Sequence, residues 1–388
     1  MVFPFMQKDL AMTDFSQTAP ARLATRLAFF AAGFSIACCA PLFPYIKGAV
    51  GADEKQFGLL LLCLGLGSIV AMPITGVLAA RRGARPMVML GGFGLVAFLP
   101  AVAMAPSPLM LGAALLVFGA SLGTIDVAMN VHGAEVEAQE KRPLMSNFHA
   151  QYSIGGFCGA GFITLLLSVG VSYMLAAWLG AGIALAAMLG ARGRLLGAKG
   201  GAPEPFALPR GVVLLFAVLA AITFLVEGAI LDWGALLIVE VGIAEVQRAG
   251  IGFILFSVTM VIGRLTGDRL VAWAGDFAIL IWGGLAAIAG IALVLTAPWP
   301  PLALAGFALV GAGAANLVPI VFSAAGRQKV MPAGLAVASV TTTGYAGVLL
   351  GPAMIGFAAD AVGLAGAFWL LAVLLVAVPL SARQVART

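Results

Sequence analysis

The sequence predicts an all-α integral membrane protein, with twelve transmembrane helices arranged as two pseudo-symmetric six-helix bundles. Three observations support this fold class. Of the 388 residues, 62% are hydrophobic and 10% are charged, whereas soluble domains carry about 25% charged residues. Apolar stretches of about 20 residues, the length of a membrane-spanning helix, recur along the chain. Lysines and arginines fall almost entirely in alternate connections between these stretches, as the positive-inside rule requires.

The longest break between apolar stretches divides the chain into six spans and six spans. It covers residues 191–210 and is basic and rich in glycine and proline. We expect a cytoplasmic tail (1–22), a first bundle (23–190), this cytoplasmic linker, a second bundle (211–381) and a second cytoplasmic tail (382–388). The expected spans lie near residues 23–46, 57–79, 87–105, 109–134, 145–167, 171–190, 211–239, 249–271, 276–296, 301–325, 333–358 and 364–381.

Basic residues set the expected orientation. Of the 21 lysines and arginines, 18 fall on the side of the two termini and the linker, and the other side holds Lys47, Lys55 and Arg248. This asymmetry predicts cytoplasmic termini in a multi-pass protein of the cell inner (cytoplasmic) membrane. It also accounts for the net charge of +5 without a nucleic-acid partner.

The connections after the second and eighth spans contain similar segments, GVLAARRGARP from Gly76 and GRLTGDRL from Gly263, which lie 187 residues apart. The first segment resembles a motif of the major facilitator superfamily, although Ala80 stands where the family usually has aspartate. The resemblance covers nearly the whole chain and implies a secondary transporter. The arginines of both loops serve as topology determinants. As an added hypothesis they form a state-dependent cytoplasmic latch, with gating residues Gly76, Arg81, Arg82, Arg85, Arg264, Asp268 and Arg269.

Four segments are similar to the branch of that superfamily that contains the fucose permease. They are SNFHAQYSIGG, EGAILDWGALL, ANLVPIVFSAAGR and TTTGYAGVLLGPAMIGFAAD. Drug/proton antiporters of the superfamily tend to carry Gly-Pro in span five, whereas here the Gly351-Pro352 pair lies in span eleven. The resemblance therefore favours import of a sugar-like or other polar solute. Export of an amphipathic compound stays open as the alternative.

Ionisable residues inside membrane spans mark pathways or proton relays. Asp126 in span four and His149 in span five are predicted at similar depth in antiparallel neighbours, so a proton-coupling Asp–His pair is geometrically feasible. Asn130 shares the helix face of Asp126, and Tyr152 lies one turn from His149; both are expected to bind substrate. The alternatives are an Asp126 that only fixes helix packing and a His149 solvated at the cytoplasmic mouth.

Span seven contains two further acids. Glu227 lies near its middle and is the third expected proton-coupling residue. Asp232 and Trp233 follow, and Gly228 and Gly234 would let the helix break there, as helices do around transporter sites. Asp232 is expected to bind substrate or to gate the outer end. Trp233 is expected either to stack on a sugar-like ring or to sit in the interfacial aromatic belt.

Polar residues in the last spans complete the expected substrate site. Asn316 of span ten lies among small residues, so it is either a substrate ligand or a link between helices. Thr342 and Tyr345 of span eleven are expected to line the same site.

The sequence favours one function class over two others. We expect a proton-coupled secondary transporter of a small organic solute, working as a monomer in the lipid bilayer without a cofactor. No nucleotide-binding GxxxxGK[ST] motif is present. A membrane enzyme is not expected, because two histidines offer no metal site and no nucleophile motif occurs. A non-transporting sensor with this fold stays open as a third hypothesis.

Overall fold

The computed structural model describes residues 15–140, 144–197 and 208–388, and in these ranges every regular element is a helix. The first half contains α1 (Phe15–Val50), α2 (Glu54–Arg82), α3 (Ala84–Ala103), α4 (Pro108–Glu140), α5 (Met145–Ser168) and α6 (Tyr173–Arg192). The second half contains α7 (Val212–Glu240), the short 3₁₀ helix η1 (Val246–Arg248), α8 (Ile251–Thr296), α9 (Pro300–Ala314), α10 (Leu317–Arg327), α11 (Ala333–Leu375) and α12 (Ala377–Ala386).

The described residues cross the membrane twelve times, as predicted. Eleven helical segments are long and apolar enough to span a bilayer, and the last of them doubles back at Gly363. Helix α8 likewise turns at Gly275. Both glycines have positive φ, a conformation that other residues rarely adopt. Helix α1 begins before the expected start of span one at residue 23, and α12 runs past the expected end of the last span at residue 381.

The two halves repeat the same backbone plan. Glycines with positive φ occur in pairs, Gly51 with Gly242, Gly83 with Gly275 and Gly170 with Gly363, spaced 191, 192 and 193 residues apart. The repeat is therefore several residues longer than the 187-residue spacing that the loop sequences suggested. In this register Ala80 matches Ala272, so neither half carries an acid at that position.

Helix packing follows the repeat as well. A Cβ atom added to Gly155 of α5 would lie 2.3 Å from the Phe30 carbonyl oxygen of α1. A Cβ atom added to Gly347 of α11 would lie 2.4 Å from the Ala221 carbonyl oxygen of α7. Small residues at these positions let the helix backbones approach closely, which is how helices associate in a bilayer.

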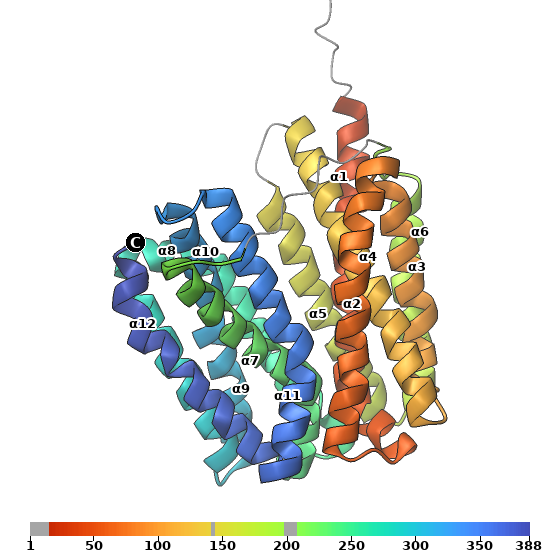
Figure 1. Ribbon diagram of the computed structural model, residues 1–388. Helices are drawn as coiled ribbons and strands as arrows, with labels where there is room; N and C mark the ends of the chain where they lie inside the picture. The colour runs from red at the N-terminus through yellow and green to blue at the C-terminus, as the bar shows by residue number, and fades with distance from the viewer. Residues whose placement is uncertain (1–14, 141–143, 198–207) are drawn as a thin grey trace, which may run out of the picture.

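The halves stand side by side, and the start of α1 and the end of α12 lie at the same end of the molecule (Figure 1). The two halves contact each other through α2 with α11, α1 with α7, and α5 with α8. The backbones of α2 and α11 approach closely, and a Cβ atom added to Gly58 would lie 2.8 Å from the Gly356 Cα atom. This contact lies near the end of the helices opposite the termini, so the halves are joined tightly at that end.

Candidate substrate and proton site

Asp126 of α4 and Tyr345 of α11 join the two halves near the middle of their helices. The Tyr345 hydroxyl faces the Asp126 carboxylate closely enough to act on it and can donate a hydrogen bond to it. The ring of Phe224 on α7, 6.0 Å from the Tyr345 ring centre, holds that tyrosine in place. A carboxylate of one half therefore meets a hydroxyl of the other half.

Tyr152 of α5 lies near this contact. Its hydroxyl is within electrostatic reach of both Asp126 and Tyr345. Tyr152 and Tyr345 are 193 residues apart, so they occupy near-equivalent positions of the two repeats. Asp126 therefore has a phenol hydroxyl of each half in its surroundings.

Glu227 of α7 and Arg264 of α8 form an ion pair beside this contact. The Arg264 Nη2 atom lies 3.2 Å from both carboxylate oxygens of Glu227, and Glu227 also acts electrostatically on Tyr345. The side chains of Glu227 and Arg264 are 20% and 38% exposed, respectively. We call Asp126, Tyr152, Glu227, Arg264 and Tyr345 the central polar cluster.

Arg264 does not occupy the cytoplasmic loop to which the sequence assigned it. It lies well inside α8, before the turn at Gly275, and pairs with Glu227 of α7. Spacing along α8 alone would offer Asp268 as a partner, because residues four apart share a helix face. The side chain of Asp268 lies outside the described part of the structure, so the expected latch role of that residue has no structural account.

His149 does not pair with Asp126. Its ring is exposed, packs edge-on against Phe29 at 5.1 Å between ring centres, and lies within electrostatic reach of Arg264. The expected pair rested on similar depth in adjacent helices, but depth does not fix the rotation of either helix about its axis. Asp126 therefore turns towards α11 while His149 turns towards α8.

Asn130 and Thr342 lie close to the cluster in sequence. Asn130 Nδ2 donates a 2.8 Å hydrogen bond to the Asp126 backbone carbonyl, so one of its amide donors is used within α4. Thr342, three residues before Tyr345 on α11, has an exposed side chain.

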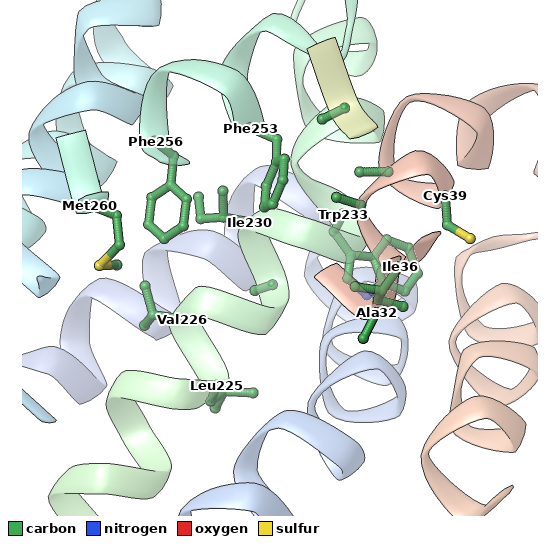
Figure 2. Close-up of a cluster of buried hydrophobic side chains, with 14 of the residues drawn as sticks. Ala32, Ile36, Cys39, Leu225, Val226, Ile230, Trp233, Phe253, Phe256 and Met260 are labelled. Atoms are coloured by element: carbon green, nitrogen blue, oxygen red, sulfur yellow. The ribbon is translucent and has the colours of Figure 1, made fainter. Parts of the chain in front are cut away.

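Trp233 lies neither in an aromatic belt nor in an open site. It is fully buried and meets the edge of Phe57 of α2 at 5.8 Å between ring centres. Figure 2 shows the Trp233 ring beside Ala32 and Ile36 of α1. Asp232, 7% exposed, is buried next to it, and the Trp233 Nε1 atom has no hydrogen-bond partner among the residues that the structure describes. These residues close the contact between the halves and are inaccessible to solute in this structure.

Asn316 links helices within the second half. It lies at the break between α9 and α10, is 7% exposed, and its Nδ2 atom donates a 3.1 Å hydrogen bond to the Gly263 carbonyl oxygen. A Cβ atom added to Gly267 would lie 2.1 Å from Asn316 Oδ1. Of the two roles the sequence allowed, the structure supports the link between helices, and the prediction of a substrate ligand is corrected accordingly.

Comparison with known proteins decides the family. A sequence profile of the Major Facilitator Superfamily matches residues 26–330. The chain belongs to the major facilitator superfamily. It is 44% identical over 371 residues to an uncharacterised MFS-type transporter of Yersinia pestis, covering 94% of this chain and 96% of the relative. It is 30% identical over 349 residues to the membrane protein MosC of Rhizobium meliloti, covering 87% and 83% of the two chains.

Solved transporter structures share the fold. A D-xylose–proton symporter superposes with a TM-score of 0.75 at 13% identity, over 94% of this chain and 97% of the other. A mutant form of the nucleoside transporter NupG superposes with a TM-score of 0.73 at 13% identity, over 95% and 99%. Identities this low establish the fold alone, and membership of the fucose permease branch stays a prediction.

In this MFS transporter the loop arginines Arg81, Arg82 and Arg85 are exposed, and within the described residues none of them forms an ion pair. Gly76 has open space where a Cβ atom would lie. In the second half Arg269 is exposed, and the expected latch stays a prediction.

Sequence reasoning missed His132, which is fully buried at the linker-side end of α4. Its Nε2 atom accepts a 2.8 Å hydrogen bond from the Leu196 backbone N–H, so Nδ1 carries the proton and donates to Thr25 Oγ1 at 2.9 Å. The Thr25 hydroxyl in turn donates to the Ala21 carbonyl. The residue fastens the start of the linker to α1 and α4. In the sequence, the only signal was the position of His132 between an apolar stretch and the acidic residues that follow it.

Proposed function

We propose that this MFS transporter is a proton-coupled secondary transporter of a small polar organic solute, with a sugar-like molecule as first choice. The observation that carries the proposal is the contact between Asp126 and Tyr345. It places an ionisable carboxylate of one half against a hydroxyl of the other half, near the middle of the membrane. Ionisable groups at this depth are costly and mark ion or proton pathways.

Such a contact couples protonation to movement of the halves. Alternating access in this fold is largely a rocking of one half against the other around a central site. The charged carboxylate accepts the Tyr345 hydrogen bond and holds the halves together on that side. Protonation weakens this acceptor, and so it shifts the balance between the two orientations of the halves.

Contacts at the end opposite the termini favour an inward-facing conformation. Phe57 and Trp233 meet across the halves, and Lys55 lies 3.9 Å from Asp360 beside the close approach of Gly58 and Gly356. With the termini in the cytoplasm, as the basic residues predict, this closed end faces away from the cytoplasm. The proposed location is the cell inner membrane, with one chain holding a complete pathway.

Uptake by the purified protein in proteoliposomes tests this function. An inward proton gradient is imposed, and accumulation of radiolabelled sugars, sugar acids and nucleosides is measured for the wild type, Asp126→Asn and Asp276→Asn. Asp276 carries a carboxylate outside the cluster, pairs with Arg327 of the same half and serves as the matched control. Gradient-driven uptake that Asp126→Asn strongly reduces and Asp276→Asn keeps supports the proposal. Transport restricted to amphipathic cations, in the outward direction, would favour the exporter instead.

A further inference from the structure

Among the residues that the structure describes, Glu227 engages only part of the binding capacity of Arg264. Its guanidinium presents five N–H donors in a planar fork suited to carboxylates. Among the residues that the structure describes, only Nη2 is engaged, by the two oxygens of Glu227, and the side chain keeps 38% of its surface exposed. A cation at this depth that is neither fully paired nor buried has donors available to a second anion.

The charged groups around Glu227 and Arg264 show which group a second anion on Arg264 would replace. Arg264 and Tyr345 are the groups that face Glu227 directly. Asp126 of α4 faces Tyr345, and His149 of α5 faces Arg264. Within the described residues, the other helices packed on α7, including α1 and α10, bring no charged group to Glu227. Arg264 is thus the one strong positive charge of the cluster, and Glu227 is its internal counter-ion.

We infer that Arg264 binds the carboxylate of the transported solute, and that this carboxylate takes the place of protonated Glu227. The inference rests on the proposed function and narrows its substrate class to small organic acids that also carry hydroxyl groups. The hydroxyls of Tyr152 and Tyr345 and the carboxylate of Asp126 face the same region and suit a polyhydroxylated body.

The exchange balances in charge and protons. In the empty cluster Glu227 is anionic and Arg264 cationic, so their sum is zero. One proton binds Glu227, and one solute carboxylate binds Arg264, so the sum is again zero. The pair therefore carries one proton with each monoanion, without net charge movement. By thermodynamic linkage, protons and the acid increase each other's affinity to the same extent.

Binding of matched acid and neutral solutes tests this inference. Thermal unfolding of the full-length protein in detergent is followed with D-galacturonate against D-galactose and D-gluconate against D-sorbitol, at pH 5.5 and pH 8. The variants are Glu227→Gln, Arg264→Gln and Asp276→Asn. The last one breaks the Asp276–Arg327 ion pair of 2.7 Å, which lies outside the cluster, and is the matched control.

The inference predicts that an acid of the panel binds the wild type more tightly at pH 5.5 and that its neutral partner does not bind. Glu227→Gln removes the counter-ion and should bind the acid at both pH values, about 10-fold or more tighter than wild type at pH 8. Arg264→Gln should lose binding, and Asp276→Asn should match wild type.

Two results would overturn the inference. Binding of the neutral solutes that survives Arg264→Gln would do so while leaving the proposed proton-coupled transport intact. Failure of folded wild type and folded Glu227→Gln to bind any acid of the panel would also do so. Loss of all proton-driven uptake in proteoliposomes, with the acids still bound through Arg264, would instead count against the proposed function.

Discussion

The hydroxyl of Tyr345 on α11 and the carboxylate of Asp126 on α4 meet across the two halves of the transporter. The two residues belong to different repeats, so rocking of the halves changes their separation. Tyr152 lies at the near-equivalent position of the first repeat, within reach of the same carboxylate. When the halves rock, Tyr152 therefore moves together with Asp126, whereas Tyr345 moves relative to it.

Removing the Tyr345 hydroxyl should slow transport without unfolding the protein. Tyr345→Phe keeps the ring against Phe224 but deletes the donor to Asp126. Hydrogen bonds to charged groups contribute about 1.5–3 kcal/mol, so we expect proton-driven uptake to fall by about 10-fold or more. Tyr45→Phe, which preserves the stacking of Tyr45 on Tyr173, is the control and should transport normally. Equal rates for wild type and Tyr345→Phe would show that the hydroxyl has no role.

Trp233 should seal the end of the transporter opposite the termini. Trp233→Ala removes a fully buried ring and should lower stability by about 3–5 kcal/mol. It should also expose the buried Cys39 of α1 to a membrane-impermeant maleimide added from the extracytoplasmic side. Labelling is measured with Cys38, Cys63 and Cys158 replaced by alanine. The control Trp178→Ala removes an exposed ring. Labelling of Cys39 that is unchanged by Trp233→Ala would contradict the seal.

A side chain at Gly58 should block closure of the halves. A Cβ atom there would lie 2.8 Å from the Gly356 Cα atom and 2.9 Å from the Pro352 carbonyl oxygen. Gly58→Val should therefore hold α2 and α11 apart and reduce transport about 100-fold or more while the purified protein stays folded. Gly161→Val introduces the same side chain into open space on α5 and should transport at the wild-type rate. Normal transport by Gly58→Val would mean that this close approach is not needed.

His132 should hold the start of the linker. His132→Phe fills a similar volume but removes the acceptor for the Leu196 N–H and the donor to Thr25. Each buried group left unpaired costs about 1–3 kcal/mol, so the melting temperature should fall by several degrees. Limited proteolysis within 191–210 should also become faster. His149→Phe, at an exposed position, serves as the control. An unchanged cleavage rate would rule out the fastening role.

Much of the fold followed from composition and periodicity. Spans of sufficient length and the distribution of basic residues predicted the twelve crossings and the two halves, because the bilayer fixes helix length and leaves few architectures. The predicted repeat spacing of 187 residues was less accurate, because it was taken from the similarity of two loop sequences. The register became visible only through backbone conformation at the paired glycines, such as Gly83 and Gly275.

The residues of the candidate site were named from the sequence more completely than their partners were. Asp126, Glu227, Tyr152 and Tyr345 were all singled out, because polar side chains inside spans need a reason to be there. Their partners depend on helix rotation and on contacts between distant helices, which spacing along one helix does not contain. For this reason the Asp126–His149 pair was wrong. The partner of Arg264 was missed for the same reason.

Burial in the closed end was equally hidden from the sequence. The segment containing Asp232 and Trp233 reads as a polar, accessible end of a span, but both residues are buried, and Trp233 packs against Phe57 of α2 and beside α1 (Figure 2). The sequence was more informative at Asn316, because the small residues around it already indicated close packing between helices.

Solute-driven proton uptake by proteoliposomes is the most direct test of coupling through Asp126. An inward gradient of the transported solute is imposed without a pH gradient, and internal pH is followed for wild type, Asp126→Asn and Asp276→Asn. We expect the interior to acidify with wild type and with Asp276→Asn, whose ion pair with Arg327 lies within one half. Asp126→Asn, whose amide mimics the protonated acid, should still exchange labelled for unlabelled solute but should carry fewer protons per solute molecule, because only Glu227 then takes up a proton. Acidification by Asp126→Asn at the wild-type rate would contradict the account.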